Sequence, residues 1–578
     1  MKRKGFLLLM VLAILLSTSF AFAEGTFAAS GNLDLEGGVK SIMISVPTPS
    51  LNVKDGWDES KTHYYENGKT KTGFVSINGT TYFFDKKGEF KSLTGMVKDE
   101  QGNWKFVRNG KVDYNATGLV QSVQAGHKSK GSYYYVENGE FKKDATGMVK
   151  GIQPDSSVKG NWYFVLNGQY KGSGTGLVEC IQAGHTSQGK YFYVENGVFV
   201  KNANGMVKGI QPNSSVKGNW YYVQDGQYKG NGTGLVECIQ AGHKSQGKFF
   251  YVEKGVFQKD VSGMVKGIQP KSSVEGNWYY VVNGQFKGSG NGLVKCVQAG
   301  HKSEGNYFYV ENGEFKKDAT GIVKGIQPNS SIKGNWYYVR GGQFKSTETG
   351  LADCVQAGYQ SKGKVYYVKN GAWQKSFTGV ADAASDGRNY YIKNGTWLKT
   401  NTTASLNGSD YVIIEGIASK VSSESDRTLW RAMKVVENIT DDSMSKEQKL
   451  RKCFDYVRTN YRESRPRTPH YTGTDWPIIY ANDMFVRGNG NCCSYAAAFA
   501  YTAKAIGYTE VYACNSGGHG WAEVDGLVYD PEWSLHGPYI YTQYGPYDYY
   551  GTTYSPQRTD MNYRGAIATG YAYMRVKI

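Results

Sequence analysis

With 578 residues, the chain is too long for one hydrophobic core and should contain several domains. Glycine (74) and tyrosine (46) are abundant while proline (13) is scarce, a composition that favours many short aromatic hairpins and argues against disorder. The formal net charge of +17 favours acidic polymers as partners, but no motif for binding nucleic acid is present.

The first 23 residues have the three-part pattern of a secretory signal peptide. Lys2, Arg3 and Lys4 supply positive charge, an apolar run follows from Phe6 to Leu16, and Ala21–Ala23 forms a small-x-small cleavage site. The apolar run is shorter than the ~20 residues of a membrane-spanning helix, and no later stretch reaches that length. We therefore expect cleavage after residue 23, an N-terminal segment at 24–54, no membrane span, and a secreted protein that is extracellular or associated with the cell wall.

A repeat fills residues 55–400. Each unit contains an aromatic strand followed by a tight turn, as in Tyr191–Val194 before Asn196-Gly197, and this pattern predicts a β-hairpin. A fixed period predicts a solenoid in which each unit buries its apolar face against its neighbours. The period is 29 residues, as shown by the glycines that open each unit: Gly118, Gly147, Gly176, Gly205, Gly234, Gly263, Gly292, Gly321, Gly350 and Gly379.

Units of two kinds alternate, so the true repeat is a pair of hairpins 58 residues long. In one kind of unit, the position four residues after the opening glycine holds cysteine, or Ser122 in the first such unit. In the other kind, this position, here called the slot, holds glycine. Because Cys, Ser and Gly share small size, we predict buried small side chains at this slot and no disulfides. We also interpret the one histidine per pair as a loop residue, not a metal ligand. These residues are Cys180, Cys238, Cys296 and Cys354, and His127, His185, His243 and His301.

Units such as Thr72–Val75 with Thr81–Phe84, leading to Thr94-Gly95, resemble the cell-wall-binding repeats of choline-binding and glucan-binding proteins. The resemblance implies a β-hairpin solenoid that binds a cell-wall polymer or glucan. The tryptophan with which that family cages choline is replaced by aliphatic residues, for example Leu119 and Met148. Because a cage for a quaternary ammonium group needs several aromatic faces, this replacement argues against choline specificity.

After residue 400 the period ends, and we expect a linker at 401–425 that leads into a helical region. Two apolar stripes at helical spacing predict two helices, and Ser445 with Gln448 forms a capping box at the start of the second. Cys453 lies on the second stripe and is expected to be buried. The stripes are Leu429, Met433, Val436 and Ile439, then Leu450, Cys453, Phe454, Val457 and Tyr461.

A loop rich in glycine and asparagine places Cys492 at the first turn of an alanine-rich helix, where the helix dipole stabilises a thiolate. His519 begins a predicted strand, and Asp530 ends the next strand after a turn at Asp525-Gly526. Cysteine catalysis needs a base that takes the thiol proton and a carboxylate that orients the base. The spacing therefore predicts a catalytic triad of Cys492, His519 and Asp530.

Several other residues compete for these roles. Cys493 is an alternative nucleophile, although it is rotated along the helix by one residue, and Cys514 is predicted to be buried in a strand. His536 and Asp525 are alternative partners, but His536 lies in an aromatic loop and Asp525 fits a turn. A reversible disulfide between Cys492 and Cys493 would switch the thiol off.

The ordered motifs G-x-C-x-x-Y-A, H-x-W-x-E-V and D-P, which contain Cys492, His519 and Asp530, resemble the transglutaminase-like superfamily. The likeness covers roughly residues 408–578 and implies a catalytic domain at 426–578. It also implies that Cys492 is the nucleophile, His519 the general acid/base and Asp530 the orienting carboxylate. The expected fold class is therefore multidomain, a β-hairpin solenoid followed by an α+β papain-like, transglutaminase-like domain.

Together the resemblances imply a secreted cysteine enzyme that forms a thioester acyl-enzyme with peptide or glutamine carbonyls. We favour a peptidase over amine cross-linking because water is always available and no amine pocket is visible in the sequence. A peptide or protein substrate is expected, with no cofactor and no metal, and the oligomeric state stays open. The alternatives are a non-catalytic adhesion protein with an inactive enzyme-like domain, and a papain-type or wall-amidase peptidase, which does not predict Trp521 and Asp530-Pro531.

Overall fold

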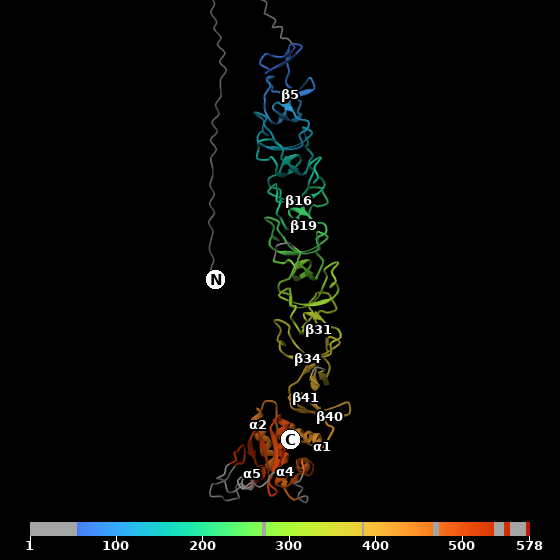
Figure 1. The fold of residues 1–578 in the computed structure, drawn as a ribbon, viewed down its shortest axis with the longest axis vertical. Coiled ribbons are helices and arrows are strands. Elements are labelled where there is room, and N and C mark those ends of the chain that lie inside the picture. The colour runs from blue at the N-terminus through green and yellow to red at the C-terminus, as the bar shows by residue number, and fades with distance from the viewer. Residues whose placement is uncertain (1–54, 269–272, 384–385, 466–472, 537–547, 555–573) are drawn as a thin grey trace, which may run out of the picture.

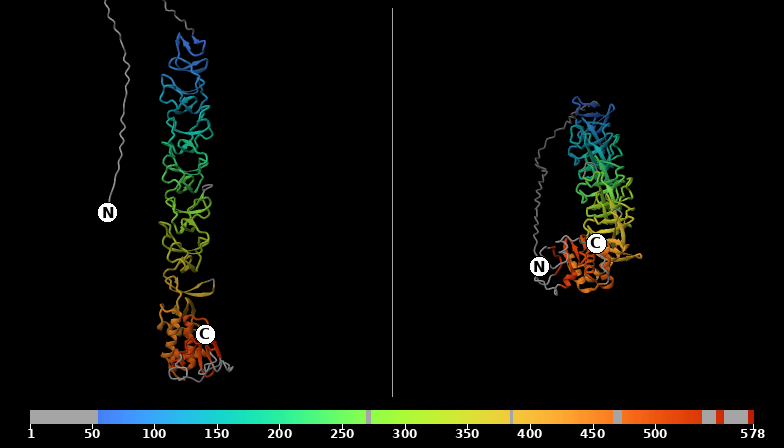
Figure 2. Two further views of the ribbon diagram at one scale, coloured as in Figure 1. Left: turned by 90° about the vertical axis from the view of Figure 1, so that its left-hand side faces the viewer. Right: turned by 60° about the horizontal axis from the view of Figure 1, so that its bottom comes forward.

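The computed structural model describes residues 55–268, 273–383, 386–465, 473–536, 548–554 and 574–578. The described chain forms a long rod of β-hairpins that ends in a small α/β domain (Figure 1 and, from two further directions, Figure 2). The expected signal peptide at 1–23 and the segment at 24–54 lie outside the described residues. None of the described helices is both long and apolar enough to cross a membrane.

Each 29-residue unit of the array contains three short antiparallel strands. In one unit, β15 (Gly176–Glu179) pairs with β16 (Tyr191–Glu195), which turns back onto β17 (Val198–Phe199). The two turn residues, Asn196 and Gly197, both have positive φ (49° and 75°), as the Asn-Gly hairpin requires. A Cβ on Gly197 would lie 2.5 Å from a carbonyl oxygen of the preceding unit, so only glycine fits this turn.

The same three strands recur along the rod. The first strands are β6 (Gly95–Lys98), β9 (Gly118–Gln121), β12 (Gly147–Lys150), β15, β18 (Gly205–Lys208), β21 (Gly234–Glu237), β24 (Gly263–Lys266), β27 (Gly292–Lys295), β30 (Gly321–Lys324) and β33 (Gly350–Asp353). The second strands are β7 (Trp104–Arg108), β10 (Tyr133–Glu137), β13 (Trp162–Leu166), β16, β19 (Trp220–Gln224), β22 (Phe249–Glu253), β25 (Trp278–Val282), β28 (Tyr307–Glu311), β31 (Trp336–Arg340) and β34 (Val365–Lys369). The third strands are β8 (Lys111–Val112), β11 (Glu140–Phe141), β14 (Gln169–Tyr170), β17, β20 (Gln227–Tyr228), β23 (Val256–Phe257), β26 (Gln285–Phe286), β29 (Glu314–Phe315), β32 (Gln343–Phe344) and β35 (Ala372–Trp373).

Shorter or altered units stand at both ends of the array. The N-terminal ones comprise β1 (Gly56–Trp57), β2 (Tyr64–Glu66), β3 (Lys69–Thr70), β4 (Gly73–Ile77) and β5 (Thr80–Phe84). The C-terminal ones comprise β36 (Gly379–Ala383), β37 (Arg388–Lys393), β38 (Thr396–Trp397), β39 (Thr402–Leu406), β40 (Ser409–Ile414) and β41 (Ile417–Lys420). The last three strands occupy the segment 401–425 that the sequence suggests as a linker. Their hairpin turns at Asn407-Gly408 and Glu415-Gly416 again have positive φ.

Buried glutamines tie successive units together. Gln182 accepts a hydrogen bond from the backbone N–H of Lys150 at 2.9 Å and donates one to the carbonyl of Thr117 at 2.8 Å. Its side chain thus connects three units and satisfies two backbone groups in the core. Equivalent buried glutamines recur at Gln153, Gln211, Gln240, Gln298, Gln327 and Gln356.

The small-residue slot behaves as the sequence predicts. The cysteines at this slot are at most 1 % exposed and are all free, and Ser122 in the same slot is also buried. The Ser122 hydroxyl lies 2.9 Å from the hydroxyl of Ser129, which satisfies it. In the alternate units a turn passes close to the backbone at the slot. A Cβ on Gly151 would lie 1.7 Å from the carbonyl oxygen of Val158. The space available at the slot therefore determines whether it holds cysteine or glycine.

The C-terminal domain packs helices against an antiparallel sheet. Its helices are α1 (Glu424–Ile439), α2 (Lys446–Asn460), α3 (Trp476–Asn482), a π-helical turn η1 (Asp483–Arg487), α4 (Cys492–Ile506) and α5 (Pro531–His536). The sheet has the order β46 (Leu527–Tyr529), β45 (Gly520–Val524), β44 (Val511–Asn515), β47 (Met574–Lys577). A short parallel pair, β42 (Arg462–Glu463) and β43 (Asn489–Gly490), precedes α4. The predicted α+β arrangement and the Ser445–Gln448 capping box are confirmed.

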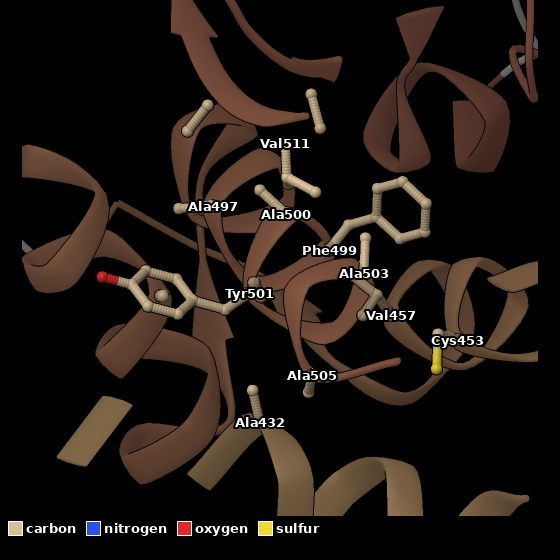
Figure 3. Packing of buried hydrophobic residues seen from close by; sticks show 14 of the residues in the cluster. Ala432, Cys453, Val457, Ala497, Phe499, Ala500, Tyr501, Ala503, Ala505 and Val511 are labelled. Atoms are coloured by element: carbon tan, nitrogen blue, oxygen red, sulfur yellow. The ribbon is translucent and has the colours of Figure 1, made fainter. Parts of the chain in front are cut away.

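Helix α4 is the centre of this domain. All of its residues are buried except Cys492 and Lys504, which are partly exposed, and small side chains let α1, α2 and the sheet approach its backbone closely. Figure 3 shows Ala432 of α1, Val457 of α2 and Val511 of β44 around α4. The helix begins at Cys492, so the packing of α4 in the core fixes the position of that residue.

The last hairpins of the array are joined to this domain by polar contacts. Glu437 of α1 accepts hydrogen bonds from the Thr402 hydroxyl at 2.6 Å and the Thr403 backbone N–H at 2.5 Å. Arg427 of α1 forms an ion pair with Asp410 of β40 at 2.6 Å. Because several side chains bridge the two parts, β39 and β40 attach the domain to the end of the rod.

Candidate active site

The start of helix α4 presents Cys492. Asn491 is the N-cap, and its side-chain oxygen accepts from the backbone N–H groups of Cys493 at 3.2 Å and Ser494 at 3.3 Å. Cys492 is partly exposed whereas Cys493 is fully buried. The first turn of the helix thus offers one accessible sulfur at the positive end of the helix dipole.

The hairpin of β45 and β46 presents the other two predicted residues. The strands turn at Asp525-Gly526 and pair Ala522 with Tyr529, which leaves His519 just before β45 and Asp530 just after β46. His519 Nε2 lies 2.5 Å from Asp530 Oδ2, and both side chains are at most 3 % exposed. The prediction that the Asp530 carboxylate reaches the His519 imidazole across the hairpin is confirmed.

Cys492 and His519 also lie together, with the sulfur and a ring nitrogen within 4.8 Å. Because Nε2 of His519 is directed at Asp530, the nitrogen that faces the sulfur is Nδ1. Gly520 makes this approach possible, since a Cβ there would lie 2.7 Å from the Cα of Cys493. The structure therefore brings all three predicted residues to one place.

The two cysteines of α4 differ in the pKa of their thiols. A hydrogen bond from Cys493 and the bond and charge of His519 outweigh burial and lower the pKa of Cys492 to about 5. The same contact with Cys492, together with burial, raises the pKa of Cys493 well above its usual range. A buried thiol with a raised pKa is a poor nucleophile, so Cys492 is the more reactive of the two.

Burial lowers the pKa of His519, but the charge of Asp530 and hydrogen bonds to Asp530 and Cys492 outweigh it and raise that pKa to about 10. The lowered pKa of the thiol and the raised pKa of the imidazole both favour a thiolate beside an imidazolium. This charge state is the one that attacks an acyl carbon and then protonates the leaving group.

Two neighbours of His519 on α5 were missed by the sequence analysis. Glu532 Oε2 lies 3.6 Å from His519 Nδ1, and the Trp533 indole N–H donates to the same nitrogen at 3.1 Å. Burial, followed by the charge of Cys492, raises the pKa of Glu532 to about 8. The sequence does contain a signal for these two residues, because they directly follow Asp530-Pro531. A proline favours the first turn of a helix, and a helix that starts at Pro531 places its first residues near the histidine.

The other candidates occupy different surroundings. Cys514 is buried in β44, as predicted, and its sulfur donates to Glu523 at 3.4 Å. Asp525 has a φ of 49° in the β45–β46 turn, as predicted for a turn residue. The side chain of His536 lies outside the described part of the chain. Cys492 and Cys493 are both free thiols in this structure.

Along the rod, half-buried tryptophans pack edge-on against the repeat histidines. In each pair of units the Trp ring meets the His ring 23 residues further on, with centroids 4.7 to 5.0 Å apart. The His Nδ1 accepts from a backbone N–H two residues later, for example Ser187 on His185 at 3.1 Å, so these histidines are turn residues as predicted. At the choline-cage position Leu119 and Met148 are at most 2 % exposed and belong to the core.

Comparisons with known proteins agree with this division. Residues 433–531 match the transglutaminase-like superfamily. Residues 92–113, 215–227, 272–285 and 331–343 match the choline-binding repeat. No curated protein sequence matches the chain.

Three solved structures of proteins from Streptococcus pneumoniae are similar to this chain. CbpJ of strain TIGR4 is 18 % identical over 62 % of this chain and 96 % of its own, with a TM-score of 0.18. Choline binding protein F is 15 % identical over 64 % and 94 %, with a TM-score of 0.17. The modular autolysin LytC, solved with a synthetic peptidoglycan ligand, is 13 % identical over 65 % and 82 %, with a TM-score of 0.19. The chain thus carries choline-binding repeats followed by a transglutaminase-like domain at residues 433–531.

Proposed function

We propose that this protein is a secreted, cell-wall-associated cysteine enzyme that acts on peptide or glutamine carbonyls through a thioester. The observation that carries the proposal is the meeting of Cys492, His519 and Asp530 at the start of α4. Its choline-binding repeats support attachment to a cell-wall polymer or glucan, and the pattern of residues 1–23 supports secretion.

In the proposed reaction the Cys492 thiolate attacks the carbonyl carbon, and the backbone N–H of Cys492 donates a hydrogen bond to the resulting oxyanion. His519 Nδ1–H then protonates the leaving amine as the carbon–nitrogen bond breaks, which leaves a thioester on Cys492. The neutral imidazole next takes a proton from water, the hydroxide attacks the thioester, and the thiolate leaves. Asp530 keeps Nε2 protonated throughout, so that Nδ1 is always the working nitrogen.

Hydrolysis and amine transfer differ only in the second nucleophile. We favour hydrolysis, because water is always available and, unlike an amine, needs no binding pocket of its own. The peptides of cell walls and secreted proteins are the substrate class that fits an enzyme attached to a wall polymer.

The test is to incubate the full-length protein with purified cell walls and with glutamine-containing peptides, with and without a primary amine, and to identify the products by mass spectrometry. Cys492→Ala is the matched control. New carboxyl termini that require Cys492 support a peptidase, and amine-labelled products support cross-linking. If wild-type protein and Cys492→Ala give identical products while both bind walls, the enzyme proposal fails and the adhesion alternative replaces it.

A further inference from the structure

Two other side chains that can ligate a metal lie beside the Cys492 sulfur. Cys492 Sγ, a His519 ring nitrogen and a Glu532 carboxylate oxygen all lie within 4.8 Å of one another. They come from α4, from the residue before β45, and from α5, and so from three separate elements of the domain. The reaction proposed above assigns no role to Glu532.

The distance between the nitrogen and the oxygen of this cluster suits a small tetrahedral ion. Zinc binds thiolate sulfur at about 2.3 Å, imidazole nitrogen at about 2.0–2.1 Å and carboxylate oxygen at about 2.0–2.2 Å. In a tetrahedral site these bond lengths place the nitrogen and the oxygen about 3.4 Å apart. His519 Nδ1 and Glu532 Oε2 are 3.6 Å apart, so they need almost no movement to share one ion.

His519 also has the hydrogen-bond partner that is typical of metal-binding histidines. A ligating imidazole usually donates its other N–H to a carboxylate, which fixes the ring and makes the free nitrogen a better ligand. His519 Nε2 does so to Asp530, which is fully buried. A ligand set of sulfur, nitrogen and oxygen favours zinc over calcium or magnesium, which take oxygen alone.

We propose that Cys492, His519 and Glu532 form an inhibitory Zn²⁺ site, with water as the fourth ligand. Zinc bound there occupies both the sulfur that attacks and the Nδ1 that carries the proton, so binding and turnover exclude each other. The ion replaces the hydrogen bond from the Trp533 indole to Nδ1. Zinc binding does not depend on which reaction, if any, the site performs.

The test measures metal binding by the full-length protein without substrate, by competition for Zn²⁺ with a chromophoric chelator. We expect one strongly bound zinc per chain, which Cys492→Ala abolishes and which Glu532→Gln and His519→Ala each weaken at least ~10-fold. Co²⁺ bound in place of zinc should show a thiolate charge-transfer band, and Cys492→Ala should remove it. Thermal unfolding of each variant checks that the domain remains folded.

The array provides matched controls. Cys238→Ser and His243→Tyr copy residues that occur naturally at equivalent positions, Ser122 and Tyr359, and should leave zinc binding unchanged. Two outcomes overturn the inference. One is that wild-type protein binds no zinc. The other is that Glu532→Gln and His519→Ala bind like wild type while Cys493→Ser does not, because the two adjacent sulfurs then hold the ion. Activity that fails without loss of zinc binding contradicts only the proposed function.

Discussion

The repeat array and the C-terminal domain use the same amino acid in opposite ways. In the array, four cysteines fill a small buried slot, and burial raises the pKa of each thiol. In the C-terminal domain, Cys492 begins a helix beside Cys493 and His519, and its pKa falls to about 5. Burial alone makes a cysteine inert, so reactivity here comes from specific hydrogen bonds and charges.

The two regions also differ in how their contacts are distributed. Each unit of the array packs against its neighbours in sequence, so the loss of one contact has local consequences. The C-terminal domain has one core around α4, which contains residues from nearly all of its elements. A change at α4 should therefore affect the whole domain and its site together.

Among the changes that leave Cys492 in place, the largest effect is expected at Asp530. Asp530→Asn should lower the rate of the proposed reaction by ~10²–10⁴-fold, because the amide cannot hold His519 with Nε2 protonated. The rate is measured on whichever substrate the wild-type protein converts. Asp525→Asn is the matched control, since Asp525 is a turn residue with a φ of 49° that asparagine tolerates. Equal losses in both variants would contradict the role of Asp530.

Gly520→Ala should destabilise the C-terminal domain by ~1–3 kcal/mol. The added methyl group would lie 2.7 Å from the Cα of Cys493, so β45 has to move away from α4. Thermal unfolding measures the effect. Gly518→Ala is the control, because a Cβ at Gly518 has no heavy atom within 4 Å. If both variants unfold like wild type, the close approach of strand and helix is wrong.

A smaller loss, about 2 kcal/mol and confined to the array, is expected for Gln240→Leu. The substitution leaves the Lys208 N–H and the Thr175 carbonyl without their partner. Gln246→Leu, at an exposed position of the same unit, is the comparison. Thermal unfolding of the full-length protein should show an earlier transition for the first variant, with the transition of the C-terminal domain unchanged.

Cys238→Ser should have the smallest effect, less than ~1 kcal/mol, because Ser245 can receive the new hydroxyl as Ser129 receives that of Ser122. The same change at Cys492 should abolish the reaction. A large loss of stability in Cys238→Ser, measured by thermal unfolding, would show that the array slot requires sulfur and not merely small size.

The sequence alone predicts a large part of this molecule because its main signals are local. The 29-residue period, the Asn-Gly turns, the helix after Asn491 and the hairpin at Asp525-Gly526 are each set by residues close in the chain. Cys492, His519 and Asp530 could be chosen for the same reason. Their catalytic roles remain a prediction.

What the sequence does not reveal depends on contacts between distant or sharply turning segments. Gln182 reaches a carbonyl 65 residues away, which no local pattern indicates. Glu532 and Trp533 face His519 only because α5 starts directly after Asp530. The need for glycine at position 520 likewise appears only when β45 lies across the start of α4.

The most direct test of the contrast between the two regions is site-resolved labelling of all cysteines with iodoacetamide from pH 4 to 9, on wild-type protein and His519→Ala. We predict that Cys492 labels rapidly, with a half-maximal rate near pH 5, that the four array cysteines stay unlabelled, and that His519→Ala moves the Cys492 midpoint to higher pH. Labelling of Cys492 that is no faster than that of Cys238, or that is unchanged in His519→Ala, would contradict an activated thiol at the start of α4.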